Sequence, residues 1–134
     1  DEPDMEGASG ETIPASVTGI WNVKGITTWH QWDAQDIIGL EQEIKLLLSQ
    51  ESISTIDARQ ITAFNIDYPE ITFRYNTYVY ILNEDGAVVE TRVNYMIYIG
   101  SYSAETDTWS GIFYHYINNL STRLWGGNWT ATRQ

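Results

Sequence analysis

ITFRYNTYVYILNEDGAVVETRVNYMIYI, residues 71–99, is the stretch of the chain that decides the fold. Val, Ile, Thr, Tyr and Phe dominate it, and a pleated, half-buried sheet surface favours these residues. Apolar and polar positions alternate along residues 71–81, which is the period of a β-strand. Asn83 to Gly86 form a strong hairpin signal, because glycine adopts positive φ without strain. The stretch therefore predicts two long antiparallel strands joined by a tight turn.

Shorter strands are predicted on both sides of this hairpin. Residues 17–24 alternate in polarity, and residues 61–66, 109–117 and 124–132 are rich in β-forming residues separated by turn signals. We count six or seven strands in all. Long strands joined by short turns form a meander that must curl, because strands twist.

A helix is predicted directly after the first strand. Apolar residues there are spaced three and four apart, as on one face of an amphipathic helix, with charged residues between them. Asp33 is the predicted N-cap, and the helix is expected to end near residues 49–52. The apolar positions are Ile37, Leu40, Ile44, Leu47 and Leu48.

Residues 1–16 differ in composition from the rest of the chain. They carry five acidic side chains and several Gly and Pro residues, so they bury too little apolar surface to offset the entropy of ordering. We predict a disordered acidic leader at 1–16 and a single β domain at 17–134. Because the sequence starts at Asp1, we expect either a mature form whose signal peptide was removed or a shortened form of the chain. The leader resembles the tether that follows the lipidated Cys of bacterial lipoproteins; the alternative is a plain disordered tail of a secreted or cytoplasmic protein.

Charge and composition exclude several classes of function. The net charge is −11, and the seven Lys and Arg residues form no basic stripe, so nucleic acid is not an expected partner. The chain has no Cys, which removes disulfides, thiolate nucleophiles and Cys-ligated metals. No apolar run reaches the ~18 residues of a membrane helix, so the expected membrane contact is an N-terminal lipid anchor alone.

No catalytic pattern is visible in the sequence. His30 and His115 are far apart, and neither has the spacing of a metal site or a catalytic triad. We therefore predict a protein that is not an enzyme and that uses no metal and no cofactor. A hydrolase using His30 or His115 with a carboxylate is kept as a third hypothesis.

One short motif resembles a known family. Gly19-x-Trp21 on the first strand is similar to the opening strand of lipocalins and of the related fatty-acid-binding β-barrels. In these proteins the Trp lies at the closed end of the barrel, and a basic residue near the end of the chain packs over it. That residue corresponds here to Arg133, with Arg123 as a second choice. The resemblance implies structural roles for Gly19, Trp21 and Arg133, and a barrel that binds a small apolar or amphipathic ligand.

Aromatic residues supply the candidate binding surfaces. Trp29, His30 and Trp32 form the densest cluster, which suits a sugar or a protein partner but also suits capping of the barrel. Tyrosines on alternating strand positions could line a ligand pocket or simply stabilise an exposed sheet face. The predicted members of this tyrosine wall are Tyr78, Tyr80, Tyr98 and Tyr114.

These observations predict a mainly β fold, a bent, barrel-like antiparallel meander with one amphipathic helix. The alternative is an α+β roll of the cystatin type. The predicted function is non-enzymatic, lipocalin-like binding of a small apolar or amphipathic ligand outside the cytoplasm, in the periplasm or at the cell surface, with lipid anchoring to the outer membrane. The alternative function is a glycan- or protein-binding module that uses an exposed Trp/Tyr surface.

Overall fold

The computed structural model describes residues 6–8, 10–30, 38–57, 59–117 and 123–134. One sheet contains all the strands, in the order β1-β5-β6-β7-β8-β9-β2-β3-β4. Neighbours are antiparallel except β1, which runs parallel to β5. The strands are β1 (Glu6–Ala8), β2 (Gly19–His30), β3 (Glu41–Leu48), β4 (Ile53–Thr55), β5 (Ile61–Asp67), β6 (Glu70–Leu82), β7 (Val88–Ser103), β8 (Thr108–Ile117) and β9 (Arg123–Arg133).

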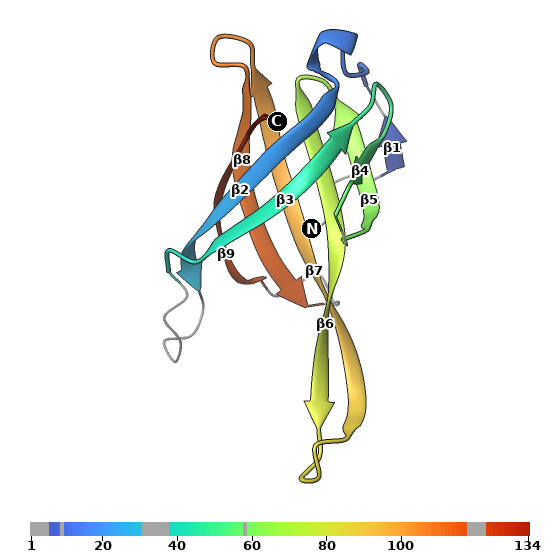
Figure 1. Cartoon of the computed structure of the whole chain (residues 1–134), viewed down its shortest axis with the longest axis vertical. Helices are drawn as coiled ribbons and strands as arrows, with labels where there is room; N and C mark the ends of the chain where they lie inside the picture. The colour runs from blue at the N-terminus through green and yellow to red at the C-terminus, as the bar shows by residue number, and fades with distance from the viewer. Residues whose placement is uncertain (1–5, 9, 31–37, 58, 118–122) are drawn as a thin grey trace.

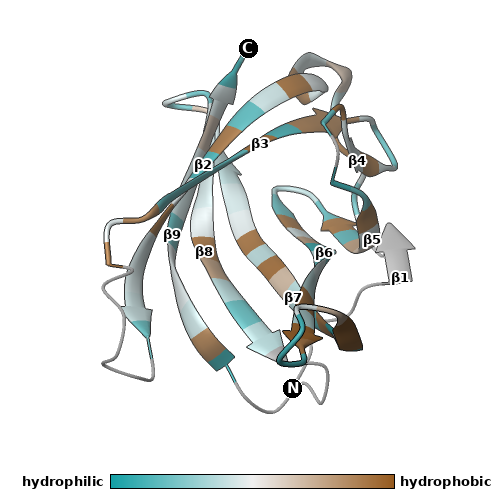
Figure 2. Ribbon diagram, turned by 60° about the horizontal axis from the view of Figure 1, so that its bottom comes forward, coloured by the Kyte–Doolittle hydropathy of each residue, from teal (hydrophilic) through white to brown (hydrophobic). Residues whose placement is uncertain are grey.

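The sheet curls into a nearly closed antiparallel barrel (Figure 1). β4 contacts β5, and this brings the far ends of the strand order together. Hydrophilic and hydrophobic residues alternate along the strands that surround the interior (Figure 2). The prediction of a mainly β, barrel-like meander is confirmed, although the described strands outnumber the six or seven predicted.

The predicted helix after the first strand is wrong. Residues 41–48 form β3, which pairs with β2 from Gly19↔Leu48 to Ile26↔Glu41. Ile44, Leu46 and Leu48 are buried while Glu43 and Lys45 are exposed, which is the alternation of a strand. The described residues contain a single 3₁₀ turn, η1 (Ala15–Val17), and no α-helix, which also removes the helix of the cystatin-like alternative. The expected N-cap Asp33 lies outside the described residues.

The boundary predicted for the disordered leader needs correction, because described residues before position 17 pack on the barrel. β1 pairs with β5, and Ile13 is fully buried in the core. The backbone N–H of Ile13 donates to the carbonyl of Gln50 at 2.9 Å, and that of Tyr68 donates to the carbonyl of Glu11 at 2.9 Å. Composition missed this anchoring because backbone pairing and the one buried side chain of Ile13 provide it.

Aromatic rings fill the centre of the barrel. Phe73, Tyr98 and Phe113 come from three neighbouring strands, and the Tyr98 ring stacks between the other two at centroid distances of 4.9 and 5.3 Å. The Trp129 indole meets Phe73 and Tyr98 edge-on, at 6.0 and 5.9 Å. Its Nε1 donates to the carbonyls of Ile99 and Ile112. Each of these four rings is almost completely buried, so the middle of the barrel is solid.

Trp21 closes one end of the barrel. Its indole is fully buried, donates to the carbonyl of Val17 at 3.0 Å and packs edge-on against Trp109. The guanidinium carbon of Arg133 lies 4.5 Å from the centre of the Trp21 ring, which is the arrangement that the lipocalin resemblance implies for these two residues. Arg133 is itself held by Asp107, with a Nε–Oδ2 distance of 2.7 Å. Gly19, two residues before Trp21, has φ +126°.

The β6–β7 hairpin continues beyond the barrel as a two-stranded arm (Figure 1). Its predicted turn is confirmed. Gly86 has φ +82°, and the Asn83 side-chain oxygen accepts hydrogen bonds from the backbone N–H groups of Asp85 and Ala87. The turn therefore fixes the register of the two longest strands, since the hairpin connection sets which residues face each other.

Ile13→Ala is expected to lower the free energy of unfolding by about 2–4 kcal/mol, because it leaves a cavity in the core. Urea unfolding followed by Trp fluorescence measures the change. Thr12→Ala is the matched control, since Thr12 is exposed and should change stability by less than about 0.5 kcal/mol. Equal stability of the Ile13 variant and the wild type would show that the segment before residue 17 contributes nothing to the domain.

Candidate functional site: the open mouth of the barrel

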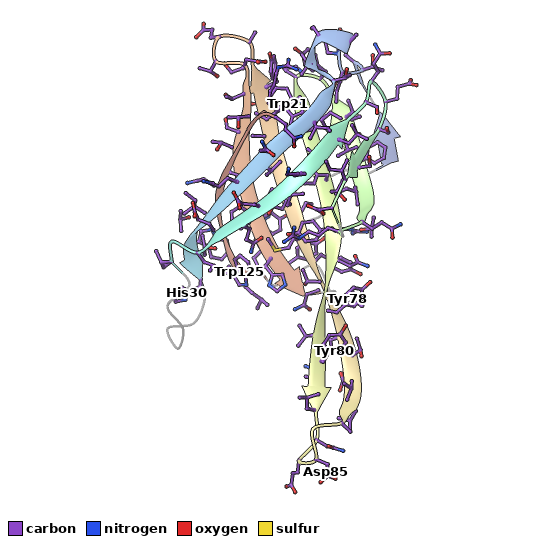
Figure 3. All side chains as sticks on the ribbon, viewed as in Figure 1. Trp21, His30, Tyr78, Tyr80, Asp85 and Trp125 are labelled. Atoms are coloured by element: carbon purple, nitrogen blue, oxygen red, sulfur yellow. The ribbon has the colours of Figure 1, made fainter. Side chains whose placement is uncertain are left out.

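Five side chains form a row across the sheet at the end of the barrel opposite Trp21. His30 on β2 faces Trp125 on β9, which faces His115 on β8. The row continues through Met96 on β7 to Tyr75 on β6. Residues that face each other across antiparallel strands point to the same side of the sheet, so the register gathers this row on one face. Figure 3 shows His30 and Trp125 at the same end of the barrel.

A pocket of about 400 Å³ opens at this end. Its floor is the Tyr75–Met96–His115–Trp125 part of the row, and residues of β3, β6 and the segment after β4 complete it. We call it the mouth pocket. The lining residues are Gln42, Arg59, Tyr75, Thr77, Tyr78, Val79, Met96, His115 and Trp125.

Gln42 links the mouth pocket to the aromatic core. Its side-chain oxygen accepts from the hydroxyls of Tyr75 at 3.4 Å and Tyr98 at 3.3 Å. Burial raises the pKa of both tyrosines above the usual value, most strongly that of Tyr98. Both hydroxyls therefore stay neutral at physiological pH. They act as fixed hydrogen-bonding groups beneath the pocket.

His115 is the titratable group of the pocket floor. Burial lowers its pKa to about 4, so the imidazole is neutral at pH 7. Its Nε2 lies 3.0 Å from the Thr77 hydroxyl, and its ring lies against the Trp125 indole with centroids 5.1 Å apart. Its other nitrogen, Nδ1, has no hydrogen-bond partner among the described residues. This nitrogen is itself buried from solvent.

Arg59 is the one cationic side chain among the described residues that line the mouth pocket. Its guanidinium carbon lies 5.6 Å from the centre of the Tyr75 ring, and its Nη1 donates to the carbonyl of Glu43 at 2.9 Å. The same nitrogen lies 3.6 Å from a carboxylate oxygen of Asp57, so this charge is only partly balanced. The pocket therefore combines an aromatic and thioether floor with one positive group at its side.

The structure does not bring the predicted site residues together. Trp29 is partly exposed and follows a β-bulge, so the next residue, His30, joins the mouth row instead. Tyr98 is in the core, Tyr114 lies on another face of β8 over Ile97, and Tyr78 and Tyr80 are exposed on the arm. The predicted tyrosine wall is therefore not one surface. Trp32 lies outside the described residues.

Sequence reasoning missed most of the mouth pocket. Gln42, Met96 and Arg59 gave no signal of a site in the sequence, and Thr77 was only a position on a strand face. His115 was considered solely as a catalytic residue. The information that identifies the pocket is the register of the strands. His115, Met96 and Tyr75 can be placed in one row only after the strand pairings are known.

A larger groove of about 800 Å³ runs along the outside of β2, β3 and β9. Most of its lining is exposed polar side chains, including Lys24, Glu43 and Lys45. We favour the smaller mouth pocket as the candidate site because aromatic and apolar side chains line it beside a few polar groups. Among the described residues no cluster of His, Asp or Glu is suited to hold a metal ion. The same part of the chain has no helix of the length and apolarity needed to cross a membrane.

Comparison with known proteins finds no matching family model, no similar curated protein and no similar solved structure.

Stability should fall between pH 6.5 and about pH 4 through His115. The folded state holds this imidazole neutral while the unfolded chain protonates it near pH 6.5, so the unfolded state gains protons as the pH falls. His115→Gln keeps a polar group and should flatten this part of the pH–stability curve, measured by urea unfolding at half-unit steps of pH. A curve of unchanged slope in the variant would show that His115 is not buried as a neutral group.

Proposed function

We propose that the protein binds a small amphipathic molecule in the mouth pocket and acts as a carrier or receptor, not as an enzyme. The observation that supports this best is the make-up of the pocket. Trp125, Tyr78 and Val79 provide apolar contact area, while Arg59 and the His115 imidazole provide polar groups beside it. Small-molecule sites commonly combine a mainly apolar lining with a few oriented polar groups.

The size of the pocket limits the ligand. Its volume of about 400 Å³ lies toward the low end of the roughly 300–1,000 Å³ typical of ligand sites. The stacked rings of Phe73, Tyr98 and Phe113 fill the barrel below it, so a ligand cannot pass to the Trp21 end. We therefore propose a ligand with one short apolar chain or a single ring system, whose other end reaches the solvent.

The charges of the pocket favour a ligand with an anionic head. The guanidinium of Arg59 is close enough to the pocket floor to contact such a head. A carboxylate oxygen of Asp57 lies 3.6 Å from Arg59 Nη1, so Asp57 neutralises this charge only in part. A neutral His115 adds a hydrogen-bond donor or acceptor, depending on its tautomer, without adding charge. A medium-chain carboxylic acid has the size and polarity that these groups would hold.

Location outside the cytoplasm and lipid anchoring are part of the proposal. They rest on the acidic leader and its resemblance to lipoprotein tethers. Membrane fractionation of cells that express the full gene tests them. Recovery of the protein in the cytoplasm would remove this part without touching the pocket.

Decanoate is expected to bind and to quench Trp fluorescence, because Trp125 lies in the pocket. Thr77→Phe should weaken binding at least tenfold by filling the pocket. Asn76→Phe is the matched control, since the alternation of β6 turns this neighbour to the opposite face. Isothermal titration calorimetry on all three proteins measures the affinities.

Decanol, which has the same chain length as decanoate but no charge, tests the contribution of the anionic head group. Arg59→Gln should weaken decanoate about three- to tenfold and leave decanol nearly unchanged, since only the acid carries a charge. Binding of oligosaccharides that Trp29→Ala abolishes and Thr77→Phe leaves intact would support the glycan-binding alternative instead. Ester or glycoside turnover that His115→Ala or His30→Ala abolishes would contradict the non-enzymatic assignment.

A further inference from the structure

The arm presents two unpaired strand edges. Among the described residues, β5 pairs with β6 as far as Ile61↔Tyr75, and β8 pairs with β7 from Asn94↔Ile117 onward. Within this part of the chain, residues 76–82 of β6 and 88–93 of β7 are therefore paired with each other alone, outside the barrel (Figure 1). Exposed backbone N–H and C=O groups on such edges are ready to pair with another strand.

The arm also exposes apolar side chains. Tyr78 is 55% exposed, Tyr80 60% and Leu82 56%, and Val88 and Val89 are exposed to a similar extent. In Figure 3 Tyr78 lies where the arm leaves the barrel and Tyr80 lies further out along the arm. An isolated two-stranded ribbon is at best marginally stable in water, and three or more strands are normally required. The arm thus has the features of an element that gains strands from a partner.

The charges on the β7 edge specify the partner. Glu90 and Arg92 flank Thr91, and they are the charged side chains in the unpaired part of β7. When two antiparallel copies of this segment pair about Thr91, Glu90 of each copy faces Arg92 of the other. Opposite charges that face each other across strands stabilise a sheet, and like charges destabilise it. Glu90-Thr91-Arg92 is therefore complementary to itself in one antiparallel register.

We propose that the protein forms a symmetric dimer in which the β7 edges of two arms pair antiparallel about Thr91. The two ribbons then join into one four-stranded sheet in the order β6-β7-β7-β6. The two copies are related by a twofold axis perpendicular to the sheet, so the same face of both ribbons lies on the same side of the joint sheet. An interface between identical surfaces requires such a twofold axis. The Glu90–Arg92 pair within each copy, with a closest distance of 2.5 Å, becomes part of a four-charge cluster.

The β7 edge suits this pairing better than the β6 edge. Residues 76–82 contain no charged side chain, so a β6–β6 contact would have no electrostatic means of fixing its register. An anionic lipid surface is a poorer occupant, because the arm tip carries Glu84 and Asp85 and the chain has a net charge of −11. Pairing with a strand of another protein would not require the β7 edge to be complementary to itself. The self-complementary Glu90-Thr91-Arg92 sequence therefore favours a second copy of this chain.

Sedimentation equilibrium of the full chain between 1 and 200 μM tests the dimer and its register. Glu90→Arg and Arg92→Glu each place like charges opposite one another, so each should raise the dimer dissociation constant at least about tenfold. The double exchange Glu90→Arg/Arg92→Glu restores opposite charges and should recover the wild-type constant. An equimolar mixture of the two single variants should form heterodimers, since each residue then meets its complement.

Thr91→Cys gives an independent test, because the chain has no cysteine of its own. The two sulfurs would lie opposite each other at the twofold axis, within disulfide reach, and mild oxidation should yield covalent dimers. Tyr80→Cys is the matched control, since Tyr80 faces Thr91 from the β6 strand and lies away from the axis. Circular dichroism confirms that each variant keeps its β fold.

Three results would overturn the proposal. The first is a monomer at every concentration. The second is a dimer that neither charge reversal weakens, which would place the contact elsewhere. The third is cross-linking of Tyr80→Cys with none of Thr91→Cys, which would assign the contact to the β6 edge. Loss of decanoate binding in Thr77→Phe bears only on the mouth pocket, so the two proposals fail separately.

Discussion

The interior of a small barrel has to be filled by side chains, and the rest of this structure depends on how that is done. Trp129 reaches across the barrel because Gly100 leaves room for it: a Cβ at Gly100 would lie 2.5 Å from Trp129 Cζ2. The indole then packs against Phe73 and Tyr98, and its Nε1 reaches two backbone carbonyls. Rings of this size remove large apolar areas from water and leave no continuous cavity.

A filled centre makes the two ends of the barrel different. At one end Trp21 is covered by Arg133, which Asp107 holds in place, so the charged group is paired and the ring is sealed. At the other end the row of Trp125, His115, Met96 and Tyr75 borders the mouth pocket, with Gln42 and Arg59 beside it. Polar groups accumulate at that end because they remain within reach of water there. Any ligand site is consequently shallow, and its depth is set by the Tyr98 ring.

The sequence predicted those features that depend on local pattern and missed those that depend on pairing. The 71–99 hairpin followed from alternation and turn chemistry, and the packing of Arg133 on Trp21 agrees with the motif resemblance. Residues 41–48 fit helical and strand periods alike, and only the partner strand β2 decides between them. The tyrosines of the predicted wall lie in the core, on the outer face and on the arm. The sequence could not separate them, because a shift of one residue in the register moves a side chain to the opposite face of the sheet. The mouth row joins five strands, so no local signal could reveal it.

The arm and the mouth pocket meet in three residues, and this joins the two proposals physically. Thr77, Tyr78 and Val79 line the pocket and also lie in the unpaired part of β6. Pairing of the β7 edges would order the arm, and with it the rim that these side chains form. A ligand that contacts the ordered rim binds the dimer more tightly than the monomer, and by reciprocity it must then strengthen the dimer by the same factor. A ligand too short to reach Tyr78 leaves the dimer unchanged, because it has no differential contact with the two states.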